Sequence, residues 1–141
     1  MEINDIYTDM ILEYSKNNIN KRHIENPDVV ELGHNPSCGD EITLEMKFDG
    51  DKIVDASYTG HGCAISQAST AIMIEQIIGK TKKEALSMVE DFLKMIKKEI
   101  TDENELESLG DAIAFKNISN MPARVKCAVL AWHTLKESIE K

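Results

Sequence analysis

Three cysteines and one aspartate are the side chains of this sequence that could together do chemistry. Cys38 lies in a loop flanked by proline and glycine, and Asp40 follows two residues later. Cys63 lies where a predicted strand meets a predicted helix, and Cys127 lies in the last predicted helix. Three thiolates and one carboxylate can surround Zn²⁺ tetrahedrally. Because no C-x-x-C pair is present, the spacing alone does not distinguish a metal site built by the fold from cysteines buried as small hydrophobes.

A complete protein shell of these four groups would leave no open position on the metal, which is typical of a structural site. A zinc-bound thiolate can still be released as a nucleophile if another ligand replaces it. His61 could instead act as the base of a thiol hydrolase that uses Cys63, although a solvated loop histidine is the simpler interpretation. His34, near the first cysteine, could likewise be a catalytic base or a solvated loop histidine. His133 is expected at the surface or packed against neighbouring side chains. A dinucleotide-binding fingerprint or a nucleophile elbow around Cys63 would each require glycine at position 65. Because Ile65 stands there, the sequence contains neither motif at this place.

Composition and charge narrow the class of protein. The chain has 141 residues, a length that predicts one domain over residues 1–141. Its formal net charge of −9 makes nucleic-acid phosphates and anionic membranes poor partners. No apolar run approaches the ~20 residues of a membrane span, and the acidic, polar start is unlike a signal peptide. Because the cysteine number is odd and a secretion signal is missing, we expect a cytoplasmic protein without a disulfide framework.

Hydrophobic periodicity predicts the elements that would position these residues. Apolar residues alternate over residues 41–48 and 52–58, around a turn at 49–51, and a shorter strand is expected at 29–32. Thr81 and Glu84 form a capping-box pattern at the start of one helix. The other helical patterns cover residues 5–16, 64–78, 82–96, 106–115 and a last helix that begins at Pro122, with 99–107 as an exposed acidic connector. This order predicts an α+β fold, with a small antiparallel three-stranded sheet packed against helices.

Three stretches of the sequence resemble the U-type iron–sulfur assembly proteins, the IscU/SufU family. They are residues 35–40 (Asn-Pro-Ser-Cys-Gly-Asp), 60–69 (Gly-His-Gly-Cys-Ala-Ile-Ser-Gln-Ala-Ser) and 122–132 (Pro-Ala-Arg-Val-Lys-Cys-Ala-Val-Leu-Ala-Trp). Lys126 precedes the third cysteine where IscU-like scaffolds carry a histidine. Together with the acidic connector, this resembles the SufU-like branch. The resemblance implies a SufE/NifU-like fold and a single U-type domain.

The resemblance also implies a function and its residues. It places zinc on Cys38, Asp40, Cys63 and Cys127 and implies a zinc-dependent sulfurtransferase that takes persulfide sulfur from a PLP-dependent cysteine desulfurase. Cys38 would leave the zinc and accept the sulfur, while a desulfurase histidine takes its place. The other three ligands would remain as anchors. Arg124, one turn before the last cysteine, is a candidate to contact a metal ligand or a partner protein, or is simply a solvated helix residue.

Other functions remain open at this point. The same four residues could hold a transient [2Fe–2S] cluster, which would make the chain an iron–sulfur scaffold. Downstream iron–sulfur scaffold proteins are candidate partners if the chain delivers sulfur instead. A metal-stabilised adaptor without chemistry of its own is a third possibility, and the thiol hydrolase described above is a fourth.

Overall fold

The structure is a computed structural model that describes residues 9, 11–14, 16, 20–35, 39–99, 107–120 and 122–140. Its order of elements is β1 (Val29–Asn35), β2 (Asp40–Asp49), β3 (Lys52–His61), α2 (Ala64–Ile77), α3 (Lys82–Ile96), the 3₁₀ segment η1 (Glu107–Asn120) and α4 (Pro122–Glu140). Of the predicted N-terminal helix, residues 9, 11–14 and 16 are described, and they are helical. Cys38 and most of the predicted acidic connector lie outside the described residues.

The three strands form one antiparallel sheet in the order β1-β2-β3. Ile42, Leu44 and Met46 alternate toward the helices and are fully buried, as the period of two predicts. Gly50 turns the chain between β2 and β3 with a φ of 62°, a conformation that glycine adopts without strain. At the opposite end of the sheet, Asn35 pairs with Asp40.

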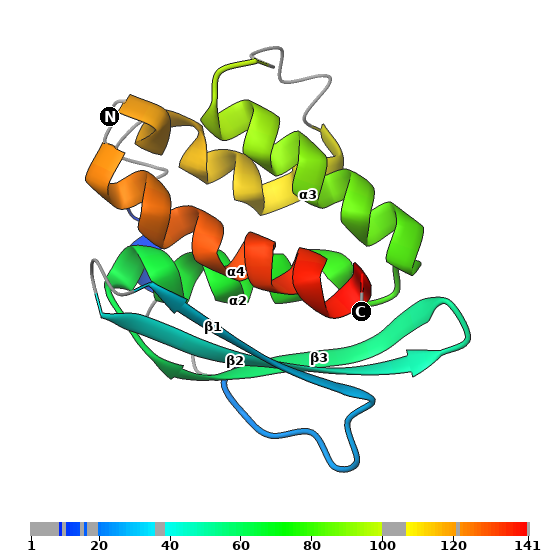
Figure 1. The fold of residues 1–141 in the computed structure, drawn as a ribbon. Coiled ribbons are helices and arrows are strands. Elements are labelled where there is room, and N and C mark those ends of the chain that lie inside the picture. The colour runs from blue at the N-terminus through cyan, green and yellow to red at the C-terminus, as the bar shows by residue number, and fades with distance from the viewer. Residues whose placement is uncertain are drawn as a thin grey trace.

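All of the long helices lie on one side of this sheet (Figure 1). Helices α2 and α4 cover the sheet directly, whereas α3 and η1 lie farther from it. Helix α2 packs against β3, α4 and η1, so nearly all of its residues from Ser66 to Ile77 are buried. A helix that is apolar around its whole circumference is expected in such a central position. Among the described helices, none combines the length and apolarity that a membrane span requires.

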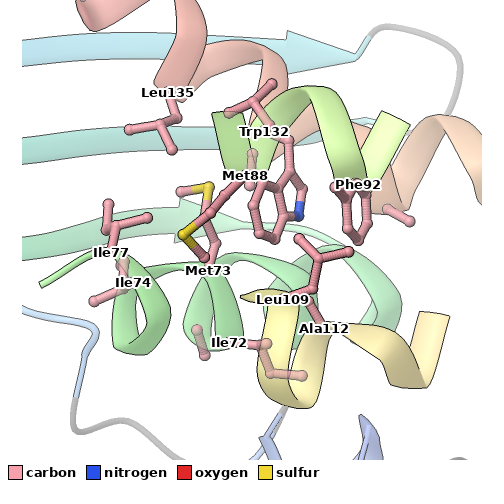
Figure 2. Packing of buried hydrophobic residues seen from close by; sticks show 14 of the residues in the cluster. Ile72, Met73, Ile74, Ile77, Met88, Phe92, Leu109, Ala112, Trp132 and Leu135 are labelled. Atoms are coloured by element: carbon pink, nitrogen blue, oxygen red, sulfur yellow. The ribbon is translucent and has the colours of Figure 1, made fainter. Parts of the chain in front are cut away.

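An aromatic cluster fills the space between α3, η1 and α4. Trp132 stacks on Phe92 with ring centroids 4.3 Å apart and an interplanar angle of 9°. Phe115 meets Phe92 edge to face at 6.1 Å. All three side chains are fully buried, and Met73 and Met88 fill the gaps around them (Figure 2). The cluster holds α4 in place against the rest of the helical layer.

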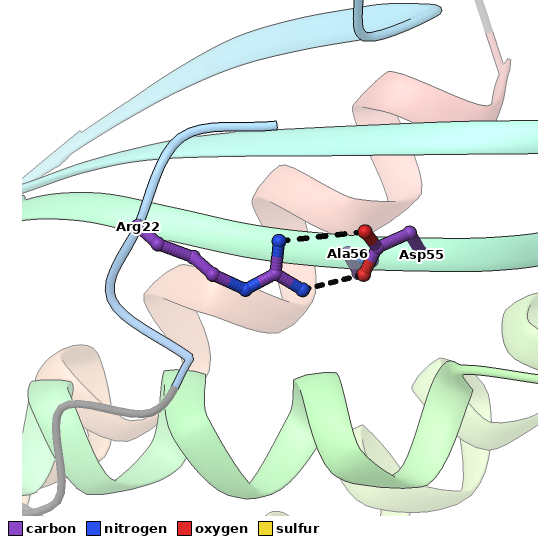
Figure 3. A network of polar contacts seen from close by, with 3 residues as sticks. All are labelled: Arg22, Asp55 and Ala56. Carbon is purple, nitrogen blue, oxygen red and sulfur yellow. Dashed lines mark hydrogen bonds and ion pairs between the residues drawn. The ribbon is translucent and has the colours of Figure 1, made fainter. Parts of the chain in front are cut away.

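Residues 20–28, here called the strap, run across the face of the sheet that the helices leave open (Figure 1). Arg22 forms two hydrogen bonds with Asp55, and these bonds lower the pKa of that carboxyl (Figure 3). His23 Nδ1 lies 2.8 Å from Glu45 Oε2, which accounts for a nearly buried glutamate in the central strand. The strap thus pairs its side chains with two carboxylates on the outer face of the sheet.

The observed elements agree with the predicted ones, with longer strands. Pairing with β2 extends the expected strand 29–32 to Asn35, and β3 continues from residue 58 to His61. The predicted helix 82–96 has the observed bounds, and its capping box is present. The short predicted helix 106–115 is a 3₁₀ segment that extends to Asn120 and contains a kink at Gly110.

We expect Thr81→Ala to lower the free energy of unfolding by about 1 kcal/mol. The Thr81 hydroxyl accepts a hydrogen bond from Glu84 N at 3.1 Å, and the Glu84 carboxylate accepts one from Thr81 N. Urea unfolding followed by circular dichroism measures the loss. Lys83→Ala, an exposed change in the same turn, is the matched control. Equal losses in the two variants would show that the cap contributes nothing.

Candidate metal centre

Asp40, Cys63 and Cys127 converge where the sheet meets α2 and α4. Asp40 is the first residue of β2, and Cys63 comes two residues after β3 ends at His61. Because Glu41 pairs with His61, the start of β2 lies beside the start of α2. The ligand atoms of the three side chains all lie within 4.8 Å of one another. Among the described residues, no other group of three His, Cys, Asp or Glu side chains converges in this way.

A hydrogen bond joins Asp40 to the first residue of the helix junction. Cys63 N donates to Asp40 Oδ1 at 2.8 Å, and the Cys63 sulfur lies 3.9 Å from Asp40 Oδ2. The carboxyl is fully buried. Burial of a carboxylate is costly unless donors or a metal compensate it. One carboxylate oxygen therefore accepts from the backbone of Cys63, and the other lies beside the sulfur of the same residue.

Cys63 is also the N-cap of α2. Its backbone is still extended (φ −70°, ψ 168°), and the helix begins at the next residue. Its sulfur accepts a hydrogen bond from Ser66 N at 3.4 Å. An N-cap acceptor satisfies one of the N–H groups that the first helical turn leaves without a partner. The cap fixes the direction of the sulfur, which is held on the same side as Asp40.

Gly62 allows this close approach. A Cβ atom on Gly62 would lie 2.5 Å from Asp40 Oδ1, which is closer than real Cβ contacts. Any other residue at this position would push the carboxylate away from Cys63. Gly62 was not among the predicted site residues. Its position next to Cys63 and at the end of a strand was the available signal.

The burial of the cluster is asymmetric. Asp40 and Cys127 are buried, whereas Cys63 is exposed. Both described cysteines are thiols that have not formed a disulfide. Two sulfurs and a carboxylate are the donor set that zinc accepts in proteins, so the residues present fit a zinc ion. They also fit iron, which takes the same thiolate ligands in clusters.

The fourth predicted ligand, Cys38, lies outside the described residues. The residues on either side are described: Asn35 pairs with Asp40, and Gly39 N donates to Asn35 O at 2.9 Å. Gly39 has a φ of 71°, which glycine adopts without strain. The assignment of Cys38 as a ligand and as a nucleophile stays a prediction.

The structure also locates the other candidate residues. His34 and His61 are exposed in the outer strands, and both pair with Glu41 between them. Arg124 is exposed on α4, one turn before Cys127, and His133 is exposed farther along the same helix. None of these four side chains belongs to the convergent cluster within the described part of the chain.

A buried network that the sequence analysis missed holds α2 against the sheet. Tyr58 OH donates to Gln67 Oε1 at 3.1 Å, and Lys21 Nζ donates to the same oxygen at 3.4 Å. Burial raises the pKa of Tyr58, which keeps the phenol protonated as a donor. Since Gln67 lies in the first turns of α2, this network fixes the helix start near the cluster.

The α+β fold and a thiol–carboxylate cluster at a strand–helix junction define a class of small assembly domains. The family model for the NifU-like N-terminal domain matches residues 6–141, and the chain belongs to this family. This confirms the predicted IscU/SufU relationship. The fold resembles that of FiSufU from Fervidobacterium islandicum, described as a scaffold protein of the SUF system. The two chains share 51% identity and a TM-score of 0.89, over 98% of this chain and 99% of that one.

Two curated relatives carry different functional names. The iron–sulfur cluster assembly scaffold protein IscU of Thermotoga maritima is 42% identical over 96% of this chain and 94% of its own length. The zinc-dependent sulfurtransferase SufU of Bacillus subtilis is 41% identical over 99% of this chain and 92% of its own length. The chain is therefore an iron–sulfur assembly protein of the IscU/SufU type.

We expect Gly62→Ala to weaken zinc binding by roughly 10–100-fold, the range found when groups that orient metal ligands are changed. The added methyl group displaces the Asp40 carboxylate from Cys63 N. Competition with a chromophoric chelator measures the affinity. Gly50→Ala, at a hairpin turn with open space around it, is the control for glycine loss in general. Unchanged zinc affinity in Gly62→Ala would contradict this account of Asp40.

Proposed function

We propose that this chain is a zinc-dependent sulfurtransferase that accepts persulfide sulfur from a PLP-dependent cysteine desulfurase, with Cys38 as the acceptor. The convergence of Asp40, Cys63 and Cys127 carries the proposal. The predicted ligand set comes from three distant parts of the sequence, and three of its four members lie together. The similarity to the Bacillus subtilis protein named a zinc-dependent sulfurtransferase supports the same function.

In this proposal Cys38 is the sulfur acceptor, and Asp40, Cys63 and Cys127 remain as anchors. Asp40 and Cys127 are buried and anchored in regular elements, so they suit the role of permanent ligands. In the sequence, Cys38 lies between the end of β1 and the start of β2, and segments that connect the strands of a rigid sheet commonly carry reactive groups. Zinc, when bound, would keep coordinating sulfurs deprotonated at neutral pH.

The sulfur transfer itself needs no external oxidant or reductant. The Cys38 thiolate attacks the terminal sulfur of the desulfurase persulfide, and a new S–S bond forms on Cys38. The S–S bond to the desulfurase cysteine breaks, and its electron pair leaves on that cysteine as a thiolate. The chain then carries one sulfane sulfur, which downstream iron–sulfur scaffold proteins would consume.

The exposure of Cys63 makes the choice of acceptor testable. We expect the zinc-loaded chain, incubated with a cysteine desulfurase and L-cysteine, to gain 32 Da on the peptide that contains Cys38, the mass of one sulfur atom. Peptide mass spectrometry after alkylation assigns the modified thiol. Cys38→Ala should retain the fold and lose both the mass gain and the stimulation of desulfurase turnover.

Two results would contradict the proposal. A persulfide on Cys63 with Cys38 unmodified would move the acceptor to the exposed N-cap thiol. Unchanged sulfur flux in Cys38→Ala would favour a metal-stabilised adaptor that only contacts the desulfurase.

A second function, an iron–sulfur scaffold, is favoured by the name of the Thermotoga maritima relative. Cys63, Cys127 and Asp40 can serve iron as well as zinc. Anaerobic incubation with iron and sulfide would then give a protein with visible cluster absorption that transfers its cluster to an apo-acceptor. Zinc in the protein as isolated, together with desulfurase stimulation and no stable cluster, supports sulfur transfer instead.

A further inference from the structure

Cys63 caps α2 and Cys127 lies in α4, so the distance between their sulfurs depends on how the two helices are placed against each other. Apolar contacts between helices are non-directional and tolerate small slides. A buried polar bond with fixed geometry would resist such a slide. The described parts of α2 and α4 contain a bond of this kind next to Cys127.

The Ser69 hydroxyl bridges the two helices. It donates to Ala128 O at 2.6 Å and accepts from Trp132 Nε1 at 3.1 Å. The direction of both bonds is determined, because an indole nitrogen can only donate and a carbonyl oxygen can only accept. Ser69 and Trp132 are completely buried, so water does not compete for these groups. Ala128 is the residue directly after Cys127.

The bridge continues a path of contacts from the sheet to α4. The Tyr58 hydroxyl binds Gln67, which fixes α2 against β3. Ser69, two residues along α2, then fixes α4 against α2. The stack of Trp132 on Phe92, with ring centroids 4.3 Å apart, also holds α4 against α3. Asp40 at the sheet and Cys127 on α4 are thereby related to each other through hydrogen bonds.

We propose that Ser69 is a positioning residue for the metal centre: its hydroxyl sets the placement of α4 that holds the Cys127 sulfur opposite Cys63 and Asp40. The inference rests on the proposed zinc centre but not on the sulfur transfer. It assigns a function in metal binding to a side chain that touches no metal ligand atom itself.

The experiment compares the full-length parent chain with Ser69→Ala and Thr70→Val, using Zn²⁺ and Co²⁺ alone as probes. Thr70 is an equally buried hydroxyl on the next residue, but it donates to Ser66 O within α2 and does not reach α4. Chelator competition gives the zinc affinity, and the visible spectrum of the cobalt form reports ligand geometry. Circular dichroism at the working temperature establishes that each variant is folded.

We expect Ser69→Ala to bind zinc roughly 10–100-fold more weakly than the parent and to show an altered cobalt spectrum. Thr70→Val should lose thermal stability while its affinity stays within about twofold of the parent and its cobalt spectrum is unchanged. Parental affinity and an unchanged cobalt spectrum in folded Ser69→Ala would overturn the inference. So would an equal loss of affinity in both variants, because a general loss of stability would then explain it.

A second pair of variants keeps the test decisive if Ser69→Ala does not fold. Ser69→Thr and Ser69→Val have the same shape and differ only in the hydroxyl group. We expect the threonine variant to bind zinc more tightly than the valine variant, and equal affinities would overturn the inference. A parent chain that binds neither metal would instead refute the zinc centre itself, and a persulfide on a thiol other than Cys38 would refute only the sulfur acceptor.

Discussion

The hydrogen bond from Cys63 N to Asp40 Oδ1 is the contact on which the geometry of the centre depends. It joins the first residue of β2 to the N-cap of α2 across 2.8 Å. A buried carboxylate must be compensated, so Asp40 and the start of α2 cannot separate without a large energetic cost. Gly62 leaves room for this contact. The sheet and α2 are thereby fixed relative to each other at the position where the two sulfurs meet the carboxylate.

The rest of the fold supports that junction from three directions. The strap pairs with β3 and places Arg22 beside Asp55 and His23 beside Glu45 on the outer face. Tyr58 and Gln67 hold α2 against the sheet, and the stacked aromatic rings hold α4 against α3. Two of the three described ligand candidates are consequently buried in rigid elements, while Cys63 remains at the surface. The described part of the centre thus combines two buried groups with one exposed sulfur.

Much of this could be predicted from the sequence, and the exceptions have physical causes. The period of two in β2 and the capping box of α3 depend on neighbouring residues, so their elements were identified with accurate bounds. The end of β1 depends on pairing with β2 and was placed too early. The cysteines were noticed because thiols are candidate metal ligands, whereas Gly62 and Ser69 look ordinary locally. Ser69 acquires its importance from Ala128 and Trp132, about sixty residues away, and no local pattern contains that contact.

The central position of α2 constrains how this protein can change over evolutionary time. Most side chains of this helix face the sheet, α4 or η1, so a substitution there must conserve volume or be matched by a neighbour. Helix α3 has an open face and can exchange residues freely along it. Divergence within the lineage should therefore accumulate on α3 and leave α2, the helix that Cys63 caps, nearly untouched.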